Sequence, residues 1–186
     1  MKGEFHLDIV DRLKNRDEAA LRLLMNDYGD ILMRTAFLLV KDRQAAEEAV
    51  QDTFIQAYRS IGQLNDHHKL KSWLVRIVIN RCRMKQRTWS WRNIFPGGGA
   101  EELPDTDMTI AAGADELVIK YIDQHKLVQA VQQLDYMYRE CIVLYYFQEM
   151  SIQEIADQLD SKENTIKSRL ARGRSQLRRL WEEEQQ

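Results

Sequence analysis

The residues of this chain best suited to chemistry are basic and amide side chains that recur at helical spacing. Arg76, Asn80, Arg83 and Arg87 follow one another at i, i+4, i+7 and i+11, so a helix would place them on one face. Arginine mainly supplies contacts to phosphate, whereas an asparagine amide can both donate to and accept from a base edge. The pattern indicates a surface that follows a nucleic-acid backbone, although basic helix faces are also common on unrelated proteins.

A second basic set lies near the end of the chain. Ser151 and Glu154 predict a capping box that opens a short helix. Asp160 to Glu163 predict a four-residue turn, and a longer helix follows, an order typical of a helix-turn-helix. Its polar face carries basic, hydroxyl and small side chains that suit the major groove: Thr165, Lys167, Ser168, Arg169, Ala171, Arg172 and Arg174. We expect this helix to bind DNA, the alternative being a two-helix hairpin of a helical repeat.

A third set mixes carboxylates with an apolar residue on a helix expected from Ala46 to Ile61. One face of that helix is apolar and predicts burial. A second face carries Glu48, Gln51, Asp52, Ile55 and Arg59. An apolar residue among polar ones suits a protein partner, and a solvated helix flank is the alternative.

The remaining aromatic, histidine and cysteine residues predict no reactive centre. Trp89 and Trp91 stand among cations and could stack unpaired bases or anchor the helix end by packing. The adjacent histidines His67 and His68 lack metal-ligand spacing and are expected to be solvated. The two cysteines are far apart in the sequence, so neither a disulfide framework nor a zinc site is expected. We expect no catalytic residue, no cofactor and no metal.

The elements that must position these sets are helices. Apolar residues recur every three or four positions, as from Ala20 to Leu39, and a helix from Lys71 to about Arg87 turns Trp73 toward a core. Both prolines and four of the eight glycines fall between these helices and the later ones, which marks a linker. The sequence therefore predicts an all-α protein of two helical domains joined by a flexible acidic linker, the second ending in the helix-turn-helix. The expected bounds are 1–95, 96–125 and 126–186.

The net charge of −2 conceals a segregated distribution. Residues 1–95 hold 17 basic and 12 acidic side chains, residues 96–125 hold 1 and 7, and residues 126–186 hold 9 and 10. Two basic patches with an acidic tether between them are typical of a bipartite nucleic-acid binder. No apolar run approaches the ~20 residues of a membrane span, and the start lacks a signal-peptide core, so a cytoplasmic location is expected.

Three blocks of the sequence resemble the extracytoplasmic-function group of the sigma-70 family of bacterial sigma factors. They are Ala46–Tyr58, Trp73–Asn80, and Glu154–Leu159 followed by Thr165–Arg174, in the order and separation of that family. The resemblance covers about residues 15–90 and 125–181. It implies a transcription initiation factor, not an enzyme, that binds core RNA polymerase, directs it to promoters with −10 and −35 elements, and begins to open them.

The resemblance also implies a role for each set of residues. Glu48, Gln51, Asp52 and Ile55 would bind the clamp of the largest polymerase subunit. The −10 element would be read and melted by Trp73, Arg76, Asn80, Arg83, Arg87 and the Gly62–Leu70 loop. The −35 element would be read as duplex by Thr165, Lys167, Ser168, Arg169, Ala171 and Arg172, while another face of that domain meets the polymerase flap. An anti-sigma factor, at the membrane in some cases, is implied as a further partner, with no small-molecule substrate.

The turn of the helix-turn-helix departs from the family pattern. It reads Asp160-Ser-Lys-Glu-Asn164 where the family usually has Gly-Ile-Ser-Glu-Gly, so Ser161 is expected to cap the recognition helix one residue early.

The alternative function is a stand-alone helix-turn-helix regulator that binds duplex DNA as a dimer. The chain shows no heptad dimerisation seam, which counts against that class. A pure protein-interaction module would leave both basic patches unused.

Overall fold

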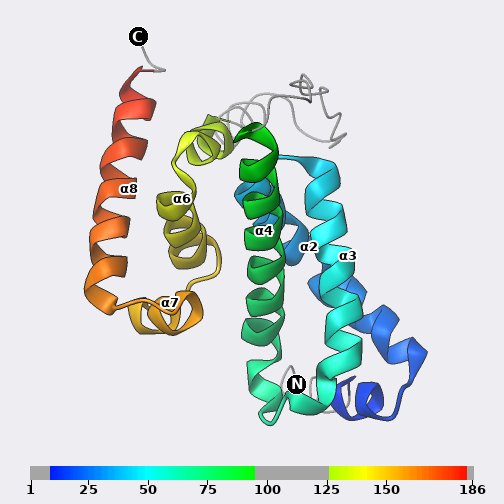
Figure 1. Cartoon of the computed structure of the whole chain (residues 1–186). Helices are drawn as coiled ribbons and strands as arrows, with labels where there is room; N and C mark the ends of the chain where they lie inside the picture. The colour runs from blue at the N-terminus through cyan, green and yellow to red at the C-terminus, as the bar shows by residue number, and fades with distance from the viewer. Residues whose placement is uncertain (1–8, 95–125, 184–186) are drawn as a thin grey trace, which may run out of the picture.

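The computed structural model describes residues 9–94 and 126–183, and nearly all of both parts is helical (Figure 1). The segment predicted as linker and the side chains of Trp89 and Trp91 lie outside the described residues. The N-terminal half, residues 9–94, contains a short helix at 9–14, then α2 (Glu18–Val40), α3 (Arg43–Ser60), the 3₁₀ turns η1 (Ile61–Gln63) and η2 (His67–Lys69), and α4 (Leu70–Ile94). The C-terminal half, residues 126–183, contains a helix at 126–133, α6 (Tyr136–Ile142), the π-helix η3 (Val143–Phe147), α7 (Ile152–Leu159) and α8 (Glu163–Glu183).

Aspartates start the first two long helices. The Asp17 carboxylate accepts a hydrogen bond from the Ala19 amide at 2.8 Å, and Asp42 accepts one from the Ala45 amide. Each carboxylate satisfies an amide that the first turn leaves without an intrahelical partner. Both caps stand at the starts of apolar stripes, so the start of each helix follows from local sequence.

The N-terminal half is a bundle in which α2, α3 and α4 all pack on one another. The buried faces of α2 and α3 are the predicted ones, with Leu24 and Leu32 on α2 and Ala46 and Ala49 on α3 fully buried. On α4 the side chains of Leu74, Val75, Val78 and Ile79 close the core. The helical stripes predicted for this half are confirmed.

In the C-terminal half, α6 packs against α8, and α7 lies across their lower ends (Figure 1). A Cβ built on Gly173 would lie 3.0 Å from Ile142 Cγ1, so the absence of a side chain there allows the two helices to approach closely. The helix at 126–133 is separated from α6 by Leu134 and Asp135. Leu127 near its start is 43% exposed, whereas Val131 and Leu134 are buried.

The end of α6 widens into the π-helix η3. The amide of Gln148 donates to the Val143 carbonyl at 3.2 Å, five residues back, instead of to the carbonyl four residues back. The extra residue in the turn displaces the side chains that follow it. Gln148 is thereby buried while its neighbour Phe147 stays exposed.

The two halves lie side by side, with α6 between α4 and α8 (Figure 1). The α6 and η3 helices contact α2, and the buried apolar residues of both halves form one continuous cluster.

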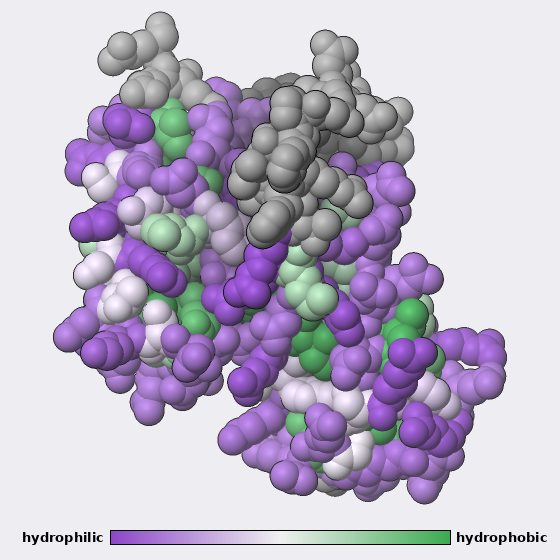
Figure 2. Space-filling model, viewed as in Figure 1, coloured by the Kyte–Doolittle hydropathy of each residue, from purple (hydrophilic) through white to green (hydrophobic). Residues whose placement is uncertain are grey.

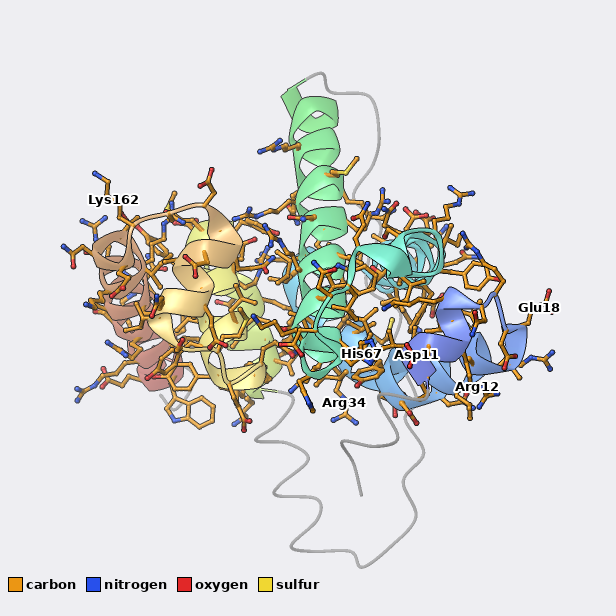
Figure 3. The ribbon with its side chains drawn as sticks, turned by 90° about the horizontal axis from the view of Figure 1, so that it is seen from below. Asp11, Arg12, Glu18, Arg34, His67 and Lys162 are labelled. Carbon is orange, nitrogen blue, oxygen red and sulfur yellow. The ribbon has the colours of Figure 1, made fainter. Side chains whose placement is uncertain are left out.

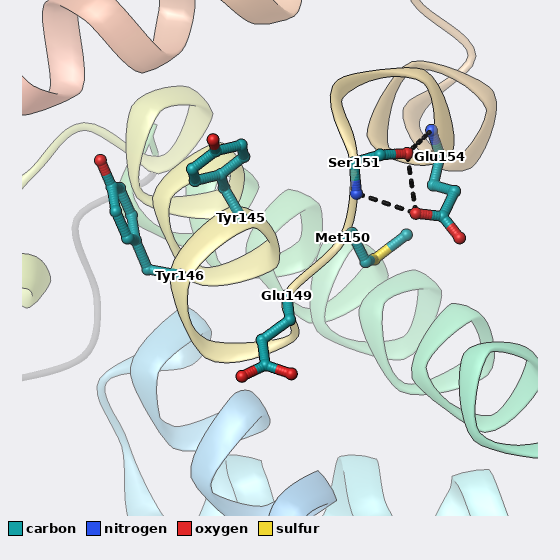
Figure 4. Close-up of a pocket in the computed structure, with 6 residues that line it drawn as sticks. All are labelled: Tyr145, Tyr146, Glu149, Met150, Ser151 and Glu154. Atoms are coloured by element: carbon teal, nitrogen blue, oxygen red, sulfur yellow. Dashed lines mark hydrogen bonds between the residues drawn. The ribbon is translucent and has the colours of Figure 1, made fainter.

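The predicted capping box opens α7 (Figure 4). The Glu154 amide donates to Ser151 Oγ at 3.2 Å, and the Ser151 amide and hydroxyl both donate to Glu154 Oε2 at 2.8 Å. These bonds lower the pKa of the Glu154 carboxyl below its ordinary value. At the other end Asp160 adopts the left-handed conformation, with φ of 49°, and closes α7.

Helix α8 begins at Glu163, and the first amides of the helix, those of Thr165 and Ile166, donate to the Lys162 carbonyl. Lys162 therefore occupies the N-cap position. The prediction that Ser161 caps this helix is wrong by one residue, since Ser161 lies outside the first hydrogen-bonded turn.

Replacement of the capping serine should destabilise the protein. We expect Ser151→Ala to lower the free energy of unfolding by about 1 kcal/mol, because one first-turn amide loses its acceptor, whereas Ser161→Ala should change it little. Urea denaturation followed by circular dichroism measures both.

The effect should also depend on pH. Because the pKa of Glu154 is lowered in the folded state, its stabilising contribution is present above the pKa of an unfolded glutamate and is lost as the pH falls through the folded value. The difference between Ser151→Ala and the parent should therefore shrink in acid. Equal effects of the two serine substitutions would contradict the assigned caps.

Candidate nucleic-acid interface and partner surface

The basic face of α4 is mostly open to solvent. Arg76, Asn80 and Arg87 are exposed, as the predicted helical spacing requires. Arg83 differs, because its guanidinium is partly buried and makes two hydrogen bonds to Glu140 of the C-terminal half, at 2.7 and 3.0 Å. The structure thus brings three of the four predicted polar residues to one open surface and engages the fourth within the protein.

Neighbouring residues on α4 hold this face in place. Trp73 is partly buried and packs against the core of the N-terminal half. Lys85 Nζ lies 2.6 Å from Glu48 Oε2 on α3, and Arg81 donates to Gln56 Oε1 at 3.3 Å. These two contacts join α4 to α3. They fix the position of the basic face of α4 relative to the exposed face of α3.

The loop before α4 is organised by Asp66 and by one of the two histidines. Asp66 accepts a hydrogen bond from the His68 amide at 3.0 Å and starts η2. His67 lies beside Asp11, with Nε2 3.6 Å from the carboxylate and 3.4 Å from Lys14 Nζ (Figure 3). His68 is exposed, as predicted, but the prediction that His67 is solvated is wrong, since only 16% of its side chain is exposed.

The predicted partner face of α3 is exposed along its whole length. Gln51, Asp52 and Arg59 are exposed, and Ile55 between them has 43% of its surface in solvent. Glu48 is exposed too, and its bond to Lys85 lowers the pKa of its carboxyl. An exposed branched apolar side chain surrounded by polar groups is the arrangement expected at the centre of a protein contact.

On α8 the predicted DNA face is also open. On the side of the molecule where α8 lies, the outer edge is mostly hydrophilic, with paler and hydrophobic residues beside it (Figure 2). Lys167, Ser168, Ala171 and Arg172 are exposed, and Thr165 is partly buried at the start of the helix. Lys167 lies 3.5 Å from Glu163, and Ser168 Oγ donates to the Asn164 carbonyl at 2.9 Å. Both contacts are local and exposed, so DNA could replace them at little cost.

Arg169 is the member of the α8 set that does not lie fully on the open face. It is partly buried and contacts Cys141 on α6. Burial raises the pKa of the Cys141 thiol to about 11, while Arg169 acts in the opposite direction. Arg169 therefore helps pack α8 on α6 as well as flanking the basic face.

Other kinds of site are not evident in the described residues. Among residues 9–94 and 126–183, no cluster of three or more His, Cys, Asp or Glu side chains is arranged to hold a metal ion. No helix in those ranges is long and apolar enough to cross a membrane. A shallow depression lined by Tyr145, Tyr146, Glu149, Met150, Ser151 and Glu154 lies beside the α7 cap (Figure 4).

Sequence reasoning missed the polar residues where the two halves meet. Arg139 and Glu140 are each 2% exposed, and Gln148 is 7% exposed. The sequence signal that could have revealed these buried groups is the charged pair Arg139-Glu140 directly before the apolar run Cys141–Leu144. Charged residues are rarely buried without partners, so a buried pair there implies partners elsewhere in the chain. Nothing in the local pattern identifies those partners.

The two halves match two family models. The model described as Sigma-70 region 2 matches residues 24–92, and the model described as Sigma-70, region 4 matches residues 124–177. These ranges contain α3 with its exposed face and α4 in the first case, and the helix-turn-helix of α7 and most of α8 in the second.

Similar curated proteins cover nearly the whole chain. The ECF RNA polymerase sigma factor SigW of Bacillus subtilis is 27% identical over 174 residues, which is 91% of this chain and 93% of that protein. The RNA polymerase sigma factor NccH of Alcaligenes xylosoxydans xylosoxydans is 29% identical over 178 residues, covering 95% of each.

Solved structures share the fold. CnrH in complex with the cytosolic domain of CnrY has a TM-score of 0.63 and 21% identity, with 94% of this chain and 95% of that chain covered. The sigma factor RpoE in complex with the anti-sigma factor NepR from Bartonella quintana has a TM-score of 0.67 and 23% identity, with 86% and 96% covered.

The exposed face of α8 predicts a specific effect on DNA binding. Arg172→Ala should weaken binding of the full chain to duplex DNA and reduce the slope of log affinity against log salt by about 1, because one phosphate contact is lost. Fluorescence anisotropy at several salt concentrations measures both.

The matched control is Arg178→Ala. Arg178 is exposed on the same helix and pairs with Glu182 at 2.9 Å, and it lies about 120° around the helix from Arg172. A salt slope reduced as much by Arg178→Ala as by Arg172→Ala would show that general charge, not this face, binds DNA.

Proposed function

The chain belongs to the sigma-70 family of RNA polymerase sigma factors, in its extracytoplasmic-function group, and we propose that it binds core polymerase, directs it to promoters with −10 and −35 elements, and begins strand opening. The observation that carries this proposal is the presence in one chain of two open basic helix faces, on α4 and α8, each within the range of a different family model. A regulator that binds duplex DNA through a helix-turn-helix alone would need only the second.

The N-terminal half supplies the polymerase contact and the −10 contact in this proposal. The exposed α3 face with Glu48, Gln51, Asp52 and Ile55 binds the clamp, and its central apolar residue gains burial there. The α4 face with Arg76, Asn80, Arg83 and Arg87 lies along the DNA, with Trp73 anchoring the helix beside it. Unstacking a base step costs a few kcal/mol, and backbone attraction and base contacts offset that cost.

The C-terminal half reads the −35 element as duplex. The capping box sets the start of α7, and the left-handed residue Asp160 ends it before α8 begins. Lys167, Ser168, Ala171 and Arg172 then face the major groove, with Thr165 and Arg169 at the edges of the contact. The division into domains at 1–95 and 126–186 with a linker at 96–125 belongs to the same proposal.

Two further features belong to the proposal. An anti-sigma factor is a partner, supported by the similar structures, in which RpoE is bound to the anti-sigma factor NepR and CnrH to the cytosolic domain of CnrY. The protein acts in the cytoplasm, where bacterial polymerase and promoter DNA are found, and it has no catalytic role of its own.

The function is tested by transcription with purified components. We expect the protein and core polymerase together to give run-off transcripts from a subset of genomic fragments whose start sites share upstream elements. The protein alone should give no specific gel shift on the same fragments. Tight, specific binding to duplex DNA as a dimer without polymerase, with no transcripts, would instead establish the stand-alone regulator.

The polymerase contact is tested on α3. Asp52→Lys should weaken binding to core polymerase by about tenfold or more, equivalent to about 1.4 kcal/mol, because it reverses a charge at the centre of the exposed face. Duplex DNA affinity should not fall. Affinity for labelled core polymerase is measured by fluorescence anisotropy.

Glu47→Lys is the control for this experiment. Glu47 is exposed on the same helix, about 140° around it from Asp52, and pairs with Arg43 at 3.0 Å, a contact of small energetic value. If both reversals weaken polymerase binding equally, the α3 face is not the specific contact.

A further inference from the structure

The loop between α3 and α4 is anchored by apolar residues and presents polar ones. Ile61, Leu64 and Leu70 are buried in the core of the N-terminal half. The side chains exposed between them carry hydrogen-bonding groups: Gln63, Asn65, Asp66, His68 and Lys69. Hydrogen bonds depend strongly on distance and angle, so a loop that distinguishes one base from another must be held in place by its surroundings.

A short segment at the start of the described chain lies against this loop. Its helix at 9–14 is fixed in the N-terminal half, because Ile9, Val10 and Leu13 are buried. The chain then turns at Arg16, whose φ of 62° is left-handed and whose amide donates to the Leu13 carbonyl at 3.0 Å. That conformation is uncommon for residues other than glycine and persists where neighbouring contacts hold it.

Those contacts join Arg16 to the end of α3, from which the loop departs. Arg16 Nη1 donates to the Tyr58 carbonyl at 2.9 Å, and the Tyr58 hydroxyl donates to the Arg16 carbonyl at 3.2 Å. The Arg16 guanidinium lies 5.0 Å from the centre of the Tyr58 ring. A cation at the carboxyl end of a helix satisfies a carbonyl of the last turn and interacts favourably with the helix dipole. Arg16 therefore fixes the first end of the loop.

The same segment contacts the other end of the loop at His67. Nε2 of His67 lies 3.4 Å from Lys14 Nζ and 3.6 Å from Asp11 Oδ1 (Figure 3). The His67 side chain is 16% exposed although the Asp11 side chain is 63% exposed, so the imidazole points inward from η2 toward the short helix. One turn of chain, from Asp11 to Arg16, thus touches the loop region at both of its ends.

We propose that Asp11, Lys14 and Arg16 form a brace across the two ends of the Gly62–Leu70 loop and act as positioning residues for base recognition at the −10 element. The inference rests on the proposed function, because it takes that loop as part of the surface that reads the −10 element. The brace acts without touching DNA. It holds the exposed polar side chains of the loop in one arrangement, and a loop with several arrangements would accept more than one base.

The brace can be weakened from outside the loop. Asp11→Asn removes the carboxylate charge beside His67, and Arg16→Ala removes the guanidinium that contacts Tyr58. Asp11→Glu keeps the charge and should restore the behaviour of the parent. Glu18→Gln and Arg22→Ala are the matched controls, because each removes one charge of the same sign from an exposed position on α2. Circular dichroism and thermal melting establish that each variant is folded.

The first measurement is hydrogen–deuterium exchange of the free, full-length protein. Peptides that cover residues 61–70 should exchange about threefold or more faster in Asp11→Asn and in Arg16→Ala, because a loop without its brace opens more often. Exchange in Asp11→Glu and in the two controls should match that of the parent.

The second measurement is base selection by the protein bound to core polymerase. The complex is incubated with a pool of randomised duplex DNA, and the bound fraction is sequenced to give an upstream and a downstream element. In Asp11→Asn and Arg16→Ala the enrichment of the preferred bases in the downstream element should fall by about threefold or more, a part of the usual effect of a mismatched base. The upstream element should be unchanged. A protein that is only less stable would bind less of the pool and keep both preferences.

The outcomes separate the brace from the function. Unchanged loop exchange in both variants would overturn the brace, and faster exchange with the parent's base preferences would overturn its role in base recognition. If Arg16→Ala does not fold, Asp11→Asn decides by the same two measurements. A parent protein that selects no downstream element would show the proposed function to be wrong, and with it the role of the brace in base recognition, whereas loop exchange would still report whether the three side chains hold the loop.

Discussion

The structure depends on two adjacent charges, Arg139 and Glu140, that are buried at the boundary between its halves. Each is 2% exposed, and they reach different partners: Arg139 the end of α2, Glu140 the guanidinium of Arg83 on α4. Buried charges are tolerated only with well-placed partners, so these two side chains specify how α6 sits against the N-terminal bundle. Apolar packing between α2, α6 and η3 is less directional and would permit other arrangements.

Local sequence was sufficient for most of the helices and for the open faces. The capping box at Ser151 and the stripes on α2 and α3 depend on contacts within one helix or between neighbouring helices, where spacing alone determines which side chains share a face. Ile55 shows the same principle: its place between Asp52 and Arg59 on a polar face predicted exposure, and it is exposed.

What the sequence could not predict is the set of contacts between the two halves. Arg83 has the same spacing as Arg76 and Asn80, yet its environment is determined by Glu140, 57 residues later. The break before α6 has a similar origin, because the carbonyls of Gln132 and Leu134 are satisfied by a side chain, that of Arg139. The position of Ser161 was misjudged for another reason: cap preferences distinguish residue types but resolve a helix start only to within about one residue.

The basic faces of α8 and α4 therefore differ in how far their side chains are already engaged within the protein. On α8, Lys167 and Ser168 make only local, exposed contacts, so its face is open while the halves remain together. On α4, Arg76, Asn80 and Arg87 are open but Arg83 is bound to a buried carboxylate. In the proposed function, duplex contact through α8 needs no rearrangement within the chain, whereas contact of Arg83 on α4 with DNA must compete with its bonds to Glu140.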